Sequence, residues 1–292
     1  MVVKMPKVSL FLFLLPSLAL ICAFGIYPIV YNAFLSLKDV NLISYIRGTA
    51  QNVGLTNYRE VLDDPLFWKA LFNTVTFTLL SIVLQMSIGF LLALLFYREF
   101  PLKGLFQALV MIPWVMPIMV SGSFFRWFLS DNGFLNNFLT ALGWIKEPIR
   151  WITTEKMAIY SLTAVNVWLG IPFNFILLYT GIQQIPEELY ESADIDGAAS
   201  WHKVMYITLP MLKPVIVATF ILGCILTFKV FDLVWIVTKG GPGGASHLLS
   251  TLSYSLAFDR FQFGKSTAVL VLMQIIVVLF ISLSNRIRWE ER

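Results

Sequence analysis

Six apolar stretches, each about 20 residues or longer, are the feature of this sequence that most limits its fold. They cover residues 8–31, 71–97, 105–125, 158–181, 214–238 and 266–285. A helix needs about 20 mainly apolar residues to cross the hydrocarbon core, where its backbone polar groups must be satisfied internally. The sequence therefore predicts an all-α integral membrane protein, with residues 1–292 forming a single transmembrane domain of six helices.

The composition agrees with this class. Hydrophobic residues make up 58% of the chain and charged residues 13%, whereas soluble domains average about 25% charged residues. This balance excludes a disordered chain, a fibrous repeat and a nucleic-acid binder. The first apolar stretch follows Lys4 and Lys7 and is too long for the apolar region of a signal peptide, so we expect an uncleaved first span surrounded by membrane lipid.

The distribution of basic residues predicts the orientation. Six spans place both termini on one side, and a cytoplasmic N-terminus makes 1–7, 98–104, 182–213 and 286–292 the inner segments. The three short ones hold 7 basic residues in 21, although the raw count over all loops does not favour this side. Because short loops respond most strongly to the positive-inside rule, both termini are expected in the cytoplasm.

Polar residues recur every three or four positions in two of the spans. The second span contains Thr74, Thr78, Ser81, Gln85 and Gly89, and the fourth contains Thr163, Asn166, Gly170 and Asn174. Each stripe must face protein or water rather than lipid. Close helix packing and a solute path both suit the second span. In the fourth, the asparagine carboxamides favour a path for a hydroxyl-rich ligand.

Lys229 and Asp232 are the ionisable pair that lies well inside an apolar run. Their spacing predicts one helix face on which the two charges neutralise each other. They either line the substrate route or form a structural ion pair. The candidate substrate path consists of Thr163, Asn166, Asn174, Thr227, Lys229 and Asp232.

Several chemistries lack the residues they need. Cys22, Cys224, His202 and His247 are isolated, so neither a disulfide framework nor a metal site is expected. No phosphate-binding G-x-x-x-x-G-K-[ST] loop occurs, so we expect no ATP site on this chain. Asp232 is the single carboxylate inside a span, which disfavours a stand-alone ion-driven carrier. No loop assembles a nucleophile with a base, which disfavours a membrane enzyme.

The inner loop 182–213 carries clear helix signals. Pro186 suits a first helical turn, and Glu187 and Glu188 complement the positive helix N-terminus. Gly197 is expected to end this helix, since glycine accepts left-handed geometry.

A second helix is expected from Ala198–Ser200 to Thr208, before Pro210 and Pro214 bend the chain into the fifth span. These features fit a docking element and a membrane-surface loop equally well.

The same loop closely resembles the "EAA" loop of binding-protein-dependent ABC importer permeases. The resemblance is carried by Glu191-Ser192-Ala193, Asp196-Gly197-Ala198, Trp201, Ile207-Thr208-Leu209-Pro210 and Pro214. Phe228–Asp232 with Thr238–Pro242, and the segment 257–264, resemble the sugar branch of maltose and glycerol-3-phosphate permeases. Ser192 replaces a usual alanine and Met205 a common phenylalanine, and neither change affects the expected fit.

The resemblance implies a type I ABC importer permease fold with a cytoplasmic coupling helix. It assigns docking on an ATP-binding subunit to Glu191, Ser192, Ala193, Asp196, Gly197 and Ala198. The implied partners are a second paralogous permease, two ATP-binding subunits that hold ATP and Mg²⁺, and an extracytoplasmic solute-binding protein. The implied location is a bacterial or archaeal cytoplasmic (inner) membrane.

The implied substrate is a sugar or oligosaccharide, and no cofactor is expected on this chain. A glycerol-3-phosphate or other polyol permease is the alternative, because Lys229 can face a phosphate. A stand-alone secondary carrier is the rival from a different class.

Overall fold

The computed structural model describes residues 7–289, and the side chains of residues 11 and 13–284. The basic residues Lys4 and Arg292, on which the expected orientation partly depends, lie outside the described residues. Two compact units make up the chain. One runs to Phe67 and resumes over Leu252–Leu279, and the other spans Trp68–Thr251 and resumes at Phe280.

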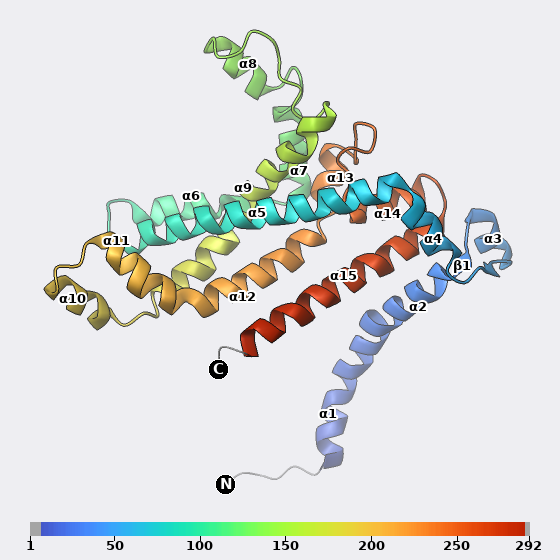
Figure 1. The fold of residues 1–292 in the computed structure, drawn as a ribbon, viewed down its shortest axis with the longest axis horizontal. Helices are drawn as coiled ribbons and strands as arrows, with labels where there is room; N and C mark the ends of the chain where they lie inside the picture. Colours follow the sequence, from blue (N-terminus) through green and yellow to red (C-terminus); the bar gives the residue numbers. More distant parts are fainter. Residues whose placement is uncertain (1–6, 290–292) are drawn as a thin grey trace. The chain divides into compact units, whose positions relative to one another are not determined.

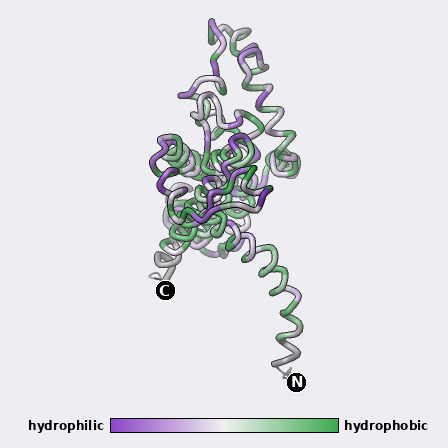
Figure 2. Tube along the Cα trace, turned by 90° about the vertical axis from the view of Figure 1, so that its right-hand side faces the viewer, coloured by the Kyte–Doolittle hydropathy of each residue, from purple (hydrophilic) through white to green (hydrophobic). Residues whose placement is uncertain are grey.

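The first unit contains the N-terminal helices and most of the C-terminal helix (Figure 1). Its elements are α1 (Lys7–Leu20), the π-helical η1 (Ile21–Ile26), α2 (Tyr27–Ser36), β1 (Lys38–Asp39), α3 (Leu42–Arg47), β2 (Gln51–Asn52), α4 (Thr56–Asp63), the end of α14 (Leu249–Phe258) and α15 (Phe263–Trp289) as far as Leu279. β1 and β2 pair antiparallel. Hydrophobic residues extend along α1 and α2 in Figure 2, as expected for a membrane span.

Close polar contacts hold the end of α2 in this unit. The Asn57 side chain in α4 is buried and donates to the backbone oxygens of Ser36 and Lys38, each at 2.8 Å. Gly264 in α15 approaches the same turn, because a Cβ there would lie 2.3 Å from the Lys38 carbonyl oxygen. α4 and the first turn of α15 therefore both fix the chain where the first span ends.

The second unit is a bundle built on two long helices. Its elements are α5 (Pro65–Tyr97) from Trp68 onward, α6 (Lys103–Val115), α7 (Ile118–Phe128), α8 (Phe134–Ala141), α9 (Glu155–Ile182), α10 (Glu187–Ile195), α11 (Ser200–Lys203), the π-helical η2 (Val204–Thr208), α12 (Leu209–Phe228), α13 (Asp232–Val237) and the start of α14. α9 packs against α6 and α12, and α7 packs against α13.

The predicted helical membrane class is confirmed. Within the described residues, five helices are long and apolar enough to span: Phe13–Ser36, Pro65–Tyr97, Glu155–Ile182, Ser200–Phe228 and Phe263–Ser284. A bent pair, α6 with α7, would make a sixth.

The third span is not the single helix predicted over 105–125. α6 and α7 meet at an angle of 95°, with the break at Met116 and Pro117. Met116 has an extended ψ of 130°, because a residue that precedes proline avoids the helical conformation. Pro117 also has no N–H to continue the helical bonding. Composition alone could not reveal this bend.

The fifth span also differs from its predicted bounds of 214–238. The helix runs over Ser200–Phe228, and α13 is a separate helix. Gly122 on α7 lies against Ile236 on α13, since a Cβ at Gly122 would be 3.0 Å from the Ile236 side chain. α7 follows the break after α6, and α13 follows the break after α12. These two helices therefore pack together.

Candidate functional site

Local sequence signals place both ends of α10. Pro186 precedes the helix, and Glu187 and Glu188 occupy its first turn. At the other end Gly197 has a φ of +73°. The amide of Ala198 donates to Ala193 O at 2.9 Å and that of Gly197 to Asp194 O at 3.0 Å. This pair of bonds is a Schellman motif, so the predicted helix and its end at glycine are confirmed.

The expected docking residues lie on an exposed segment. Glu191, Ser192, Asp196 and Gly197 are exposed, while Ala193 and Ala198 are half-buried. Large apolar side chains beside them are also exposed: Ile195 at 87%, Trp201 at 67% and Tyr206 at 77%. Clustered exposed apolar side chains mark sites of protein or membrane contact.

Short-range contacts tie α10 to the helices of its unit. The hydroxyls of Tyr190 and Thr208 are hydrogen-bonded at 2.9 Å. The Tyr190 ring lies 5.8 Å from that of Tyr97 at the end of α5, and Asp194 forms an ion pair with Lys203. These contacts join α10 to the end of α5 and to the helix that leads into α12.

The predicted second helix and the fifth span are continuous, and the bend expected at Pro210 and Pro214 stays a prediction. Ser200–Phe228 forms one helical span. η2 closes with the Leu209 amide donating to Val204 O, five residues earlier. Pro210 follows in the first turn of α12, where its missing N–H interrupts least. Residues 187–198, which include the expected docking residues, therefore lead directly into this span.

The two polar stripes meet at the α5–α9 contact. Gln85 Nε2 donates to the backbone oxygen of Asn166 at 2.8 Å. Asn174 Nδ2 donates to Gln85 Oε1 at 3.4 Å and to Gly170 O at 2.9 Å. A Cβ at Gly89 would come within 2.9 Å of the α9 backbone. In this region the stripes pack two helices together, which is one of the two uses expected.

Four buried polar atoms of the two stripes have no hydrogen-bond partner within the described residues. They are Thr78 Oγ1, Ser81 Oγ, Asn166 Nδ2 and Asn174 Oδ1. Thr163 is also buried, but its hydroxyl donates to Ile159 O at 2.8 Å. An unpartnered buried polar atom costs about 1–3 kcal/mol. Water or a hydroxyl-rich solute that reached these atoms would remove that cost.

The prediction that Lys229 and Asp232 share a helix face is wrong. α12 ends at Phe228 with Lys229 as its cap, and Asp232 begins α13. Both side chains are exposed, and no ion pair joins them in the part of the chain that the structure describes. The cation at a helix C-terminus and the anion at a helix N-terminus each complement the local dipole. Thr227 is buried in the last turn of α12.

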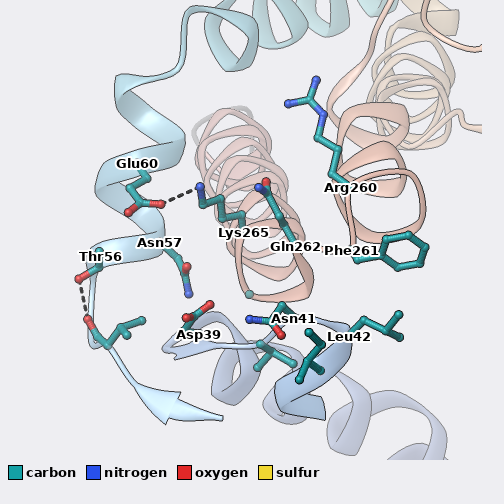
Figure 3. A pocket seen from close by; sticks show the side chains of 14 residues that line it. Asp39, Asn41, Leu42, Thr56, Asn57, Glu60, Arg260, Phe261, Gln262 and Lys265 are labelled. Carbon is teal, nitrogen blue, oxygen red and sulfur yellow. Dashed lines mark hydrogen bonds and ion pairs between the residues drawn. The ribbon is translucent and has the colours of Figure 1, made fainter. Parts of the chain in front are cut away.

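A cavity of about 650 Å³ lies in the first unit, and its lining includes none of the residues predicted as a site. Its polar lining includes Asp39, Asn41 and Gln262. Figure 3 shows Glu60 and Lys265 pointing toward each other across one wall, where they form an ion pair at 2.8 Å. Sequence spacing could not indicate this cavity, because its walls come from segments about 200 residues apart in the chain.

Residues 85–288 match the family described as binding-protein-dependent transport system inner membrane component. This chain belongs to that family. The match includes α9, α10 and the whole segment resembling the EAA loop, so the expected membership in the ABC importer permeases is confirmed.

Curated relatives of this permease cover nearly its full length. The trehalose/maltose transport system permease protein MalF of Thermococcus litoralis is 35% identical over 92% of this chain and 90% of its own. The lactose transport system permease protein LacF of Rhizobium radiobacter is 32% identical over 92% and 91%. The sulfoquinovosyl glycerol transport system permease protein SmoG of Agrobacterium fabrum is 32% identical over 90% and 84%.

Solved structures confirm the type I permease fold. A chain of a bacterial alginate ABC transporter, crystallised with an alginate pentasaccharide-bound periplasmic protein, has a TM-score of 0.82 at 22% identity. The structural match covers 95% of this permease and 93% of the transporter chain. A chain of the MetNI methionine ABC transporter has a TM-score of 0.56 at 21% identity, over 77% and 97%. At these identities the likeness concerns the fold alone.

Proposed function

We propose that this permease is one of two membrane subunits of an ATP-driven importer for a sugar or oligosaccharide. The observation that carries the substrate class is the set of relatives named for trehalose/maltose, lactose and sulfoquinovosyl glycerol transport, each matched over at least 84% of its length. A second paralogous permease, two ATP-binding subunits with ATP and Mg²⁺, and an extracytoplasmic solute-binding protein complete the complex.

Residues 187–198, the coupling segment, supply the proposed mechanical link. Glu191, Ser192, Ala193, Asp196, Gly197 and Ala198 dock on the ATP-binding subunit, and the exposed apolar side chains nearby support a protein contact. ATP-driven closure of those subunits displaces α10. The bond between Tyr190 and Thr208 and the continuous helix over Ser200–Phe228 carry the displacement into the membrane. This mechanism requires α10 and both termini to be cytoplasmic.

The proposed substrate path comprises Thr163, Asn166, Asn174, Thr227, Lys229 and Asp232. Its strongest support is that Asn166 Nδ2 and Asn174 Oδ1 are buried without partners, because a donor and an acceptor suit sugar hydroxyls. Lys229 and Asp232 support it by their exposure at the break between α12 and α13.

The direct test is uptake by the reconstituted complex. Proteoliposomes that contain both permeases and the ATP-binding subunits, with the binding protein outside, are offered labelled maltose, trehalose, lactose and glycerol-3-phosphate. We expect uptake of a sugar that requires ATP inside the vesicle. Uptake of glycerol-3-phosphate alone would establish the polyol alternative, and uptake by this chain without ATP would establish a secondary carrier.

A further inference from the structure

The Gln85 side chain on α5 forms two hydrogen bonds with α9. It is only 4% exposed, and both ends of its carboxamide are bonded. Nε2 donates to Asn166 O at 2.8 Å, and Oε1 accepts from Asn174 Nδ2 at 3.4 Å. The carboxamide thus bonds to two residues of α9 that lie eight positions apart in the sequence.

The lack of a side chain at Gly170 leaves the space that this carboxamide occupies. A Cβ at Gly170 would lie 2.3 Å from the carboxamide carbon and from Nε2 of Gln85. No real side chain tolerates that distance, so any larger residue at this position displaces the carboxamide. Gly170 therefore makes room for the Gln85 side chain in particular. This is in addition to the close helix approach that small residues generally allow in membrane proteins.

Two buried atoms that Gln85 does not bond are suited to bind a sugar hydroxyl. Asn166 and Asn174 each keep one unpartnered buried atom, a donor Nδ2 and an acceptor Oδ1. Gln85 holds the backbone of the first residue and the side chain of the second. A side chain that is already fixed loses less conformational entropy when it binds a ligand.

We propose that Gln85 is a positioning residue for substrate: without contacting the sugar, it orients the Asn174 carboxamide and holds the α9 backbone at Asn166, so that both residues can receive sugar hydroxyls. The inference rests on the proposed path through these two asparagines. It predicts that Gln85 affects the affinity for sugar while leaving the coupling segment, and hence the maximal turnover, intact.

The test replaces Gln85 with methionine, which keeps the length and packing of the side chain but forms neither bond. Sugar uptake is measured in proteoliposomes of the complete transporter, with whichever of maltose, trehalose or lactose the wild type imports. We expect the KM of Gln85→Met to rise about fivefold or more, with the maximal rate within about twofold of wild type.

Gln107→Met is the matched control. Gln107 lies in α6, is half-buried, and forms no side-chain hydrogen bond within the described residues, so this variant should keep the wild-type KM. A purely structural role for Gln85 predicts a different pattern, in which the maximal rate and the amount of assembled complex fall together at constant KM. That pattern would overturn the proposal.

A double-mutant cycle with Gly170 tests the geometry itself. Gly170→Ala should raise the KM in the wild-type background, because its methyl group displaces the Gln85 carboxamide. In a Gln85→Ala background the space is open, and the same substitution should change the KM by less than about twofold. Equal effects in the two backgrounds would show that Gly170 acts independently of Gln85.

Uptake by Asn166→Leu, measured beside Gln85→Met, distinguishes a failure of the positioning role from a failure of the proposed path. An unchanged KM in Gln85→Met together with a raised KM in Asn166→Leu would leave the path standing and overturn the role of Gln85. An unchanged KM in both variants would overturn the path and the positioning role together.

Discussion

Asn166 and Asn174 are unusual residues for a membrane helix, because each buries a carboxamide with one polar atom unbonded in the described structure. Each such atom costs about 1–3 kcal/mol. Leucine would fill a similar volume in this position at no such cost. On the proposed substrate path, contact with a polar solute during transport would offset this cost.

Replacement of both asparagines by leucine should therefore impair transport rather than assembly. We expect the KM for the imported sugar to rise about tenfold or more, since two hydrogen bonds are lost, while the complex assembles normally. Uptake kinetics and size-exclusion profiles of the purified complex measure the two effects. Asn137→Leu, at an exposed position of α8, is the control. An unchanged KM would assign the stripe to helix packing.

The elements predicted best are those whose ends have local signals. α10 begins after Pro186 and ends at Gly197 as predicted, because proline, acidic residues and glycine act within one helical turn. The contact between Gln85 and Asn166 could not be predicted, because spacing shows that a polar face exists but not which helix it meets. Gln85 appeared in a stripe without an assigned partner.

Breaks inside apolar segments were predicted least well. Pro117 offers a signal for the 95° bend between α6 and α7 that a count of apolar residues overlooks. The break after Phe228 has no proline or glycine, and its charges can be read equally well as an ion pair on one helix. The cap and first-turn positions of Lys229 and Asp232 depend on packing that the sequence alone does not reveal.

Gly197, at the end of α10, is the position where a substitution should disturb the coupling segment. Gly197→Val puts a β-branched residue at a φ of +73°, at a cost of about 1–2 kcal/mol or more, and so disturbs the helix end. We expect uptake and sugar-stimulated ATP hydrolysis to be lost while membrane insertion is kept.

Gly48→Val is its matched control. Gly48 caps α3 with a φ of +65°, and a Cβ at either glycine meets nothing within 4 Å. The backbone strain is therefore the same, but the position lies outside the coupling segment. Equal loss of uptake in the two variants would attribute the effect to destabilisation, and normal uptake by Gly197→Val would contradict the coupling assignment.

Across the second unit, the coupling segment and the proposed path are parts of one continuous framework. α10 contacts the end of α5 through Tyr190 and Tyr97, and α5 carries Gln85 to the α5–α9 contact. The helix over Ser200–Phe228 leads from the coupling segment to the break at Lys229. In the proposed mechanism, this connection would let events at an ATP-binding subunit change the surroundings of the sugar.

Co-purification with an ATP-binding subunit tests the central claim most directly. The permease is isolated from detergent-solubilised native membranes as wild type, as Glu191→Lys and as Glu147→Lys, which reverses an exposed charge outside α10. The account predicts that wild type and Glu147→Lys retain an ATP-binding protein and that Glu191→Lys loses it. Retention by Glu191→Lys equal to wild type, or a wild-type chain that is isolated alone and transports without ATP, would contradict it.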